Sequence, residues 1–403
     1  GGQTVLEKGS LKAVVSLYVD GATPAFNAGD TVILIDGSDG AISGGVDNDK
    51  AHVSHGATLS YVFDVKVEGN QLKAALSGEP SVNPQAKALP EAQLAVMSVI
   101  GLGGELAAGQ GMGEAVRAAR LASLSGGTPL ALFTSFSGGR YRLDTGSHVD
   151  VSGYSLMAGL AFGADLGPGF LTLGAFFEYG KGSYDTYNSF ANAAPVHGSG
   201  DIHYVGGGLL GRLDIEGVGP GRLYLEASGR MGRARNSFSS MDLTDYLGRV
   251  VRFDSGSRYM GFHVGAGYVW EITDAISLDL HGKYFWTKQE GDSVTLSTGD
   301  PVTFKDAYSS RLRLGGRLSF SVSGRVRPYV GAAYEWEFDG KSRATAHGRH
   351  IRTPSSRGGT AMGELGLSIT PSPSSRFSID LGVQGYAGKK RGVTGSLALK
   401  YVF

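Results

Sequence analysis

The final segment of the chain, Val393–Phe403, alternates apolar side chains with small or polar ones, and this pattern limits the possible folds more than any other. Leu397, Leu399, Tyr401 and Phe403 fall on one face of a period-two strand, whereas most residues between them are small or polar. A transmembrane β-strand has this character, because one face meets lipid and the other meets a lumen. We therefore expect Val393–Phe403 to be a membrane-spanning strand.

The same alternation recurs in twelve segments between about residue 130 and Phe403. In one of them, Leu171, Leu173 and Phe177 share a face, while Thr172 and Glu178 share the opposite face. Twelve spans form an even number, as in bacterial single-chain barrels. In a closed barrel the first span, about Leu130–Leu143, must pair with the last.

Charged residues occupy the polar faces of these segments, and we expect them to line the lumen. Arg311 and Arg313 alternate within one run, which a dry core would hold poorly but a polar lumen would hold easily. The predicted lumen-facing charges are Glu178, Arg212, Glu226, Arg230, Glu271, Arg311, Arg313, Arg317, Glu335, Glu337 and Glu364.

The connections between the segments alternate in length. Short ones include Gly167–Gly169 and Gly217–Gly221, and the long ones are Tyr184–Gly200, Asn236–Gly256, Glu290–Ala307 and Gly340–Arg357. Short turns on one rim and long loops on the other are typical of outer-membrane barrels. The predicted fold class is an all-β membrane protein, a 12-stranded antiparallel outer-membrane β-barrel at 126–403.

Two further regions precede the barrel. Residues 1–87 hold short β-type runs with Gly and Asp turn signals, consistent with a small sandwich or with the last rungs of a β-helix. Residues 88–125 have helical character, in runs at Ala92–Ala108, where we expect Gly101, Gly103 and Gly104 to break the helix, and Met112–Ser123. This segment is rich in glycine and small residues, so we expect it inside the polar lumen rather than in lipid.

The helical segment also carries charges suited to anchoring. Glu114 and Arg117 lie three residues apart and can pair on one helix face. Arg117 and Arg120 are the predicted anchors to the barrel wall, with Glu335 or Glu364 as partners.

Composition excludes several function classes. The chain has 37 Lys and Arg against 37 Asp and Glu, so a zero net charge provides no reason to expect nucleic acid as a partner. It has no cysteine, which excludes disulfides and thiolate metal sites. We expect no cofactor.

Three stretches make the chain resemble the C-terminal part of a monomeric autotransporter (type Va secretion). They are Gly109–Val116 at the linker, Gly146–Tyr154 leading into the second strand, and Leu399–Phe403 at the end. The resemblance covers about residue 90 to Phe403 and covers 1–85 only loosely. It implies a 12-stranded translocator barrel, a linker helix through its pore and a passenger end at 1–87.

The resemblance also implies where the protein works and with what partners. The chain would be a monomer in the outer membrane of a Gram-negative bacterium, with residues 1–87 on the cell surface. Periplasmic chaperones and the β-barrel assembly machinery would be partners, the latter through Leu397, Leu399, Tyr401 and Phe403. Some relatives cut themselves at paired asparagines in the linker; no Asn-Asn occurs between Leu89 and Leu130, so we expect no such cleavage here.

Other functions remain as alternatives. His203, His263 and His281 fall on polar faces, but they lie on different segments, so we expect no metal site. The inward acids and bases are better explained as a lumenal salt network than as a catalytic set, so we expect no enzyme activity. The main alternative is a plugged outer-membrane channel, a porin-like pore for small solutes.

Overall fold

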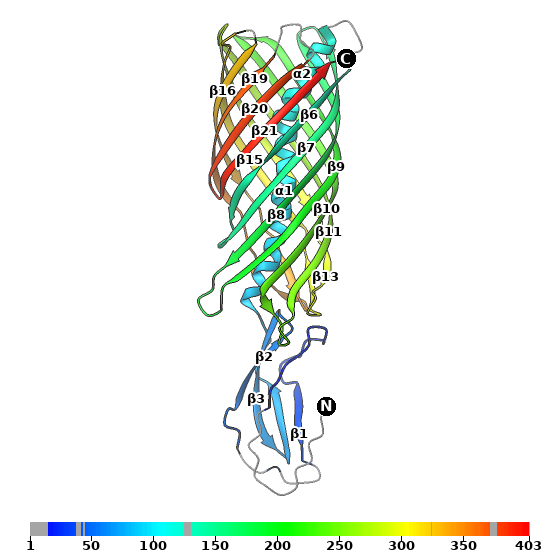
Figure 1. The fold of residues 1–403 in the computed structure, drawn as a ribbon, viewed down its shortest axis with the longest axis vertical. Helices are drawn as coiled ribbons and strands as arrows, with labels where there is room; N and C mark the ends of the chain where they lie inside the picture. Colours follow the sequence, from blue (N-terminus) through cyan, green and yellow to red (C-terminus); the bar gives the residue numbers. More distant parts are fainter. Residues whose placement is uncertain are drawn as a thin grey trace.

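The computed structural model describes residues 15–37, 42, 45–124, 130–323, 325–370 and 377–402. Figure 1 shows a tall barrel with a helix along its axis and a small N-terminal sheet beyond one rim. The C-terminus lies at the opposite rim, near the end of the helix.

The barrel is closed and has twelve antiparallel strands, as the alternation predicted. Its closing seam pairs the first strand with the last, in a register that runs from Leu143↔Lys390 to Ala131↔Val402. In chain order the strands are β6 (Leu130–Asp144), β7 (His148–Asp165), β8 (Gly169–Asn188), β9 (Val196–Val218), β10 (Gly221–Thr244), β11 (Val250–Thr273), β12 (Ile276–Gln289), β15 (Ala307–Phe320), β16 (Val326–Glu337), β19 (Gly358–Ile369), β20 (Phe377–Gly388) and β21 (Lys390–Val402).

The outer wall of the barrel carries the apolar side chains. Leu209, Met231 and Leu365 are 67%, 69% and 64% exposed, although each lies within a long strand whose neighbouring residues face the lumen. Exposed apolar side chains on alternate residues suit a wall that meets hydrocarbon. Because every strand edge is paired, the wall leaves no unpaired edge to lipid.

Two of the predicted long loops are wrong in extent. Residues 184–188 and 196–200 belong to β8 and β9, and 236–244 and 250–256 belong to β10 and β11. About 10 residues of a tilted strand cross a bilayer, whereas β10 and β11 have 24 residues each. These strands therefore continue well past the membrane on the long-loop side. There the chain stays in β-strands, and their inner faces pack on the helix.

The other two long connections form a small sheet of their own. It contains β13 (Ser293–Thr295), β14 (Pro301–Phe304), β17 (Ala344–Ala346) and β18 (Arg349–His350), in that order. We call it the loop sheet.

The lumenal helix has one interruption. It begins as a 3-10 turn at Pro84–Lys87 (η1), continues as α1 (Ala88–Leu106), widens at Ala107–Gly111 (η2) and ends as α2 (Met112–Leu124). Gly109 has φ −105° and ψ −109°, outside the helical region, so the helical axis kinks there. The expected breaks at Gly101, Gly103 and Gly104 do not occur.

The helix passes through the barrel, not through lipid. Pro84–Ser123 is long and apolar enough to span a membrane, but 78% of its most apolar stretch is buried inside the structure. The glycines that were expected to break the helix instead let the wall approach. A Cβ on Gly103 would lie 2.3 Å from the Tyr204 hydroxyl.

The N-terminal sheet contains β1 (Thr31–Asp36), β2 (Lys50–His55), β3 (Leu59–Glu68), β4 (Gln71–Leu76) and β5 (Ser81–Val82). Its order is β1-β4-β3-β2 with β5 on β3, and every named pair is antiparallel. The expectation of a β-helix end is therefore wrong for the described part of the region, because a parallel β-helix stacks its strands in parallel. Tyr61 and Phe63 are both 1% exposed and form the centre of its core.

Candidate functional site in the barrel lumen

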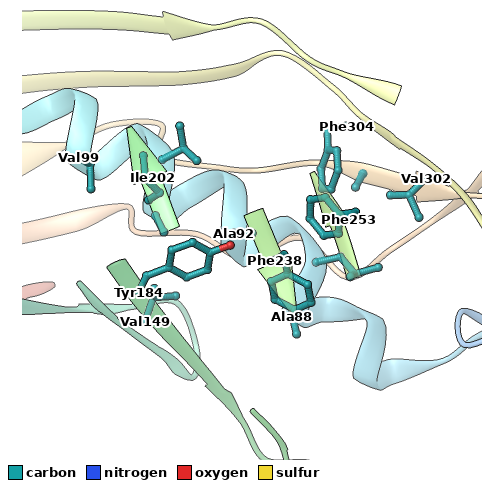
Figure 2. Close-up of a cluster of buried hydrophobic side chains, with 14 of the residues drawn as sticks. Ala88, Ala92, Val99, Val149, Tyr184, Ile202, Phe238, Phe253, Val302 and Phe304 are labelled. Atoms are coloured by element: carbon teal, nitrogen blue, oxygen red, sulfur yellow. The ribbon is translucent and has the colours of Figure 1, made fainter. Parts of the chain in front are cut away.

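An apolar collar surrounds α1 at the long-loop end of the lumen. On the helix, Leu89, Val96 and Val99 are at most 2% exposed. Aromatic rings from β10, β11 and the loop sheet pack around it, with ring centroids 5.2 Å apart for Phe238–Phe253 and 5.4 Å apart for Phe253–Phe304. Figure 2 shows this collar. Close packing of this kind excludes water from the end of the pore.

A buried polar network ties the first turn of α1 to the wall at the same level. The Lys87 ammonium lies 3.2 Å from the Glu91 carboxylate and donates to Ser147 at 2.8 Å and Asn188 at 2.9 Å. Thr145 donates to Glu91 at 2.7 Å. Because both charges are buried and satisfied, this network fixes where the helix leaves the barrel.

Midway along the lumen, Glu105 forms the charged link between helix and wall. Its carboxylate lies 2.5 Å from Arg311, 3.6 Å from Arg313 and 3.5 Å from Lys390. Glu335 shares two of these cations, at 3.1 Å from Arg311 and 2.7 Å from Arg313. These five groups form the Glu105 clamp, with two acids and three bases from one helix and three strands.

A second wall contact lies one turn away on α1. Arg230 pairs with Glu178 at 2.9 Å and donates to the backbone carbonyl of Ile100 at 2.6 Å. Tyr259 donates to the same carboxylate at 2.7 Å. The wall thus hydrogen-bonds to the helix backbone itself, where Gly103 leaves room for Arg230.

At the interruption of the helix, wall side chains bond to one backbone carbonyl and to one side chain of the helix. Lys283 donates to the carbonyl of Ala108 at 2.5 Å, and the Gln110 amide donates to Asp380 at 2.9 Å. Beside them lies a lumenal cavity of about 150 Å³ with mostly polar lining, including Glu226 and Glu364.

The expected pair of Glu114 and Arg117 forms, but the wall partners of the predicted anchors on α2 differ from those expected. Arg117 pairs with Glu114 on its own helix and lies 3.5 Å from Asp380. Arg120 lies 2.9 Å from Glu216 and 3.5 Å from Asp214. The predicted partners Glu335 and Glu364 are wrong for both arginines, because arginines of β15 pair with these two glutamates instead.

Most predicted lumenal charges pair with a charge on another strand, either the adjacent strand or the next one along the wall. Arg212 lies 3.4 Å from Glu226, and Arg317 lies 2.6 Å from Glu364. Glu337 accepts hydrogen bonds from the Ser309 hydroxyl and the Ser310 amide.

Two positions lie elsewhere. Glu271 is at the short-turn rim, with its side chain 61% exposed and 3.3 Å from Arg222. His203 was expected to face the lumen, which is wrong: it is exposed on the outer wall, because β9 buries Ile202 and Tyr204 instead.

The predicted assembly signal lies in the closing strand. Leu397 and Leu399 are part-exposed and pair in register with Phe136 and Thr134 of β6. The backbone of Tyr401 continues that ladder, and Phe403 lies outside the described residues.

Beyond the long-loop rim, the N-terminal sheet docks on the loop sheet through Asp300. Its carboxylate accepts from the amides of Ala57 and Thr58, at 3.1 and 3.2 Å, and lies 3.5 Å from Nε2 of His347. The His347 ring lies 4.3 Å from the ring of His55. Arg249–Asp20 at 2.9 Å adds a peripheral ion pair.

Several functional residues were missed from the sequence, namely Glu105, Lys390, Lys283, Asp380 and Asp300. Glu105 had a detectable signal, since it is the one ionisable residue in the apolar run Ala92–Ala108. A charge in such a run, if buried, requires a partner. The others could not be found by pattern, because the contacts that identify them, such as Lys390 with Glu105 and Asp300 with Ala57, join residues far apart in the chain.

Comparison with known proteins agrees with the barrel fold described above. The family model described as Autotransporter beta-domain matches residues 124–384. The β-domain of the Bordetella autotransporter BrkA is 14% identical with a TM-score of 0.52, and the match covers 68% of this chain and 99% of that one. No curated protein matches the sequence.

Two further solved structures share the fold. The transport unit of AIDA-I from Escherichia coli is 17% identical with a TM-score of 0.50, covering 68% of this chain and 90% of that one. The translocator domain of NalP from Neisseria meningitidis is 15% identical with a TM-score of 0.51, covering 72% of this chain and 94% of that one.

Proposed function

The chain belongs to the autotransporter beta-domain family and forms an outer-membrane translocator, and from that premise we propose that residues 1–87 stand on the cell surface. In this proposal they are the membrane-proximal end of a passenger that has crossed the barrel. The helix of residues 88–124 remains in the pore as a monomeric anchor.

One observation carries the proposal: the helix threads the closed barrel from rim to rim. α2 ends beside the start of β6 at the short-turn rim, and the N-terminal sheet lies beyond the long-loop rim. Short turns are periplasmic and long loops external in outer-membrane barrels. A chain that enters at one rim and leaves at the other has its N-terminal part outside.

The geometry also supports two separate roles for the contacts around the helix once the passenger has crossed the barrel. The apolar collar around α1 blocks water at the external mouth, and the Glu105 clamp resists sliding of the helix. If the helix slid, buried charges would lose their partners, which is strongly unfavourable. The barrel is therefore a carrier first and a sealed anchor afterwards.

We further propose that the assembly machinery of the outer membrane recognises the closing strand, with periplasmic chaperones guarding the unfolded chain. Support comes from β21, whose pairing with β6 closes the barrel and leaves neither strand with a free edge. The proposal that the chain is not an enzyme is supported by its lumen, where the buried acids pair with bases instead of pointing at a common substrate site.

The test is surface exposure of an epitope at residue 1 in the full chain, secreted in a Gram-negative host. Protease on intact cells should remove the epitope and leave a protected barrel-sized fragment. A matched epitope in the short turn 217–221 should survive until the outer membrane is opened. The opposite protection pattern would reverse the orientation and overturn the proposal.

The rival function, a plugged solute channel, draws support from the polar cavity of about 150 Å³ beside the helix break. It predicts high single-channel conductance with the helix in place. The anchor predicts low conductance that rises sharply when residues 88–124 are deleted. Planar-bilayer recordings of both proteins separate the two.

A further inference from the structure

A group of basic side chains lies on the outer wall of the barrel just beyond its apolar surface. On β10, Met231, Arg233 and Arg235 share the outward face, and Met231 is 69% exposed. On β11, Arg258 precedes Met260 on the same outward face. The sequence along both strands therefore changes from lipid-type to cationic within two residues.

The strand register brings five basic groups together. Arg233 lies directly opposite Arg258. Arg235 lies opposite His203 of β9, and His203 lies opposite Lys181 of β8. We call these five residues the basic patch; Figure 1 shows β8, β9, β10 and β11 adjacent on one side of the barrel.

The described residues form no ion pair with the basic patch, which therefore keeps an excess of positive charge. Directly opposed like charges destabilise a strand pair, and within the described ranges no acidic side chain lies within ion-pair distance of any of its five members. The nearest outward acids by register are Glu290, whose backbone amide donates to the carbonyl of Arg258 at 2.9 Å, and Asp201, two residues beyond His203. A fold that tolerates such repulsion leaves an anion-binding surface.

The patch also sits at the level where lipid headgroups lie. Lys181 is opposite Tyr154, whose ring lies 5.7 Å from that of Phe136. Phe262, two residues beyond Met260 on the same face, stacks on Trp286 at 5.4 Å. Aromatic girdles of this kind mark the membrane interface in β-barrels, so the basic patch faces the headgroup layer on the long-loop side.

We propose that the basic patch binds the phosphate groups of an anionic glycolipid of the outer leaflet. Guanidinium groups match phosphate bidentately, and the opposed pair Arg233 and Arg258 offers two such forks side by side. A lipid satisfies both halves of the surface, because its phosphates meet the arginines while its acyl chains cover Met231 and Met260. Free phosphate would bind the arginines but would leave the apolar surface of Met231 and Met260 uncovered.

The experiment measures binding of diphosphoryl lipid A to the purified, folded full chain in non-ionic detergent. The variant Arg233→Gln/Arg258→Gln removes two charges and keeps most of each stem. We expect roughly 25-fold weaker binding, about fivefold for each basic residue at an anionic lipid surface. Arg233→Lys/Arg258→Lys should restore most of the affinity, because the charge returns without the fork.

The matched control is Arg352→Gln/Arg357→Gln, two exposed arginines of the loop Ile351–Arg357 on the same side of the membrane. Its affinity should stay within about twofold of the parent, since neither residue borders the apolar wall. Heat-modifiable migration on gels checks that each barrel is folded. If the Gln variant does not fold, the salt dependence of the parent decides: affinity must fall as salt rises.

Three results would overturn the proposal. One is equal binding of the dephosphorylated glycolipid, which would remove the phosphate from the recognition. Another is inorganic phosphate binding as tightly as the lipid, which would identify a free-ion site. The last is an affinity for diphosphoryl lipid A that neither salt nor the Arg233→Gln/Arg258→Gln change reduces.

Discussion

α1 and α2 lie end to end in one lumen, but different interactions hold them. α1 carries buried Leu89, Val96 and Ile100 against aromatic rings, and it has no basic residue. α2 buries mainly alanines and meets the wall through Arg117 and Arg120. Closing the pore and fixing the helix therefore depend on different residues. The external half excludes water from the pore, and the Glu105 clamp between the halves fixes the position of the helix.

The largest expected effect is at the junction of the two halves. Glu105→Ala leaves three bases with one acid, Glu335, in a buried cluster. Breaking a buried pair on one side costs about 3–5 kcal/mol. We expect lower stability to urea in detergent and frequent channel openings in planar bilayers. Glu216→Ala, at the 48% exposed partner of Arg120, serves as control and should change neither. If the Glu105→Ala barrel keeps its stability to urea and its low rate of channel opening, the Glu105 clamp does not hold the helix.

The apolar half should respond to loss of volume instead of charge. Ile100 is 0% exposed within the collar, so Ile100→Ala should lower the free energy of unfolding by about 3 kcal/mol, mid-range for such a truncation. Leu121→Ala on α2 removes a partly buried side chain and should cost less. The measurement is urea titration of both variants. If the two costs are equal, the two halves do not differ in packing.

Acid should loosen the docked N-terminal sheet before it affects the lumen. Burial, and next the neighbouring His347, lower the pKa of His55 below 6.5. Docking therefore favours neutral His55, and this contribution is lost as pH falls below 6.5. Burial alone would raise the pKa of Asp300, but the neighbouring His347 and hydrogen bonds from Thr298 and Thr58 lower it to about 2. Its contribution is lost only as pH falls from 3.8 towards 2.

The chain has no cysteine, so a dye pair at Lys66→Cys and Thr353→Cys can report this docking by energy transfer. We expect reduced transfer at mildly acidic pH, and His55→Gln should flatten that dependence. Glu105 and its partners should stay closed over the same range, as read from conductance. Transfer that does not change with pH in the parent protein would contradict the role of His55.

The smallest expected effect is at the short-turn end. The Arg120 side chain is 35% exposed and its partner Glu216 is 48% exposed, so water and salt screen the pair. Arg120→Gln should change the free energy of unfolding by less than about 1 kcal/mol. A loss comparable to that of Glu105→Ala would mean that α2, and not the clamp, holds the helix. Urea titrations of the two variants side by side decide this.

The barrel could be predicted because its signal is local. The alternation along each strand indicated which residues face lipid, and the number of strands indicated that β6 meets β21. Strand ends were harder to predict. Residues 184–188 and 236–244 looked like loop because polar outward residues such as Asp185 continue the strand beyond lipid, where apolar alternation on the outer face stops.

The lumenal partners were only partly predictable. Arg117 was identified as a pairing residue from its spacing to Glu114, a local relation. Its wall partner, Asp380, and the clamp from Glu105 to Lys390 depend on how far the helix is inserted and how it is rotated. No periodicity in the sequence encodes either quantity. The register of β9 also placed His203 on the opposite face from the one expected.

Local sequence patterns account for the membrane barrel, its closure and the presence of a polar lumen, because side-chain period and turn length are properties of short segments. The way the lumen is filled depends on the folded structure. The depth of the helix, the kink at Gly109 and the pairing of Glu105 with three distant bases depend on a barrel that must already be closed. A buried charge is satisfied only by what surrounds it in space, and that arrangement comes from the whole fold.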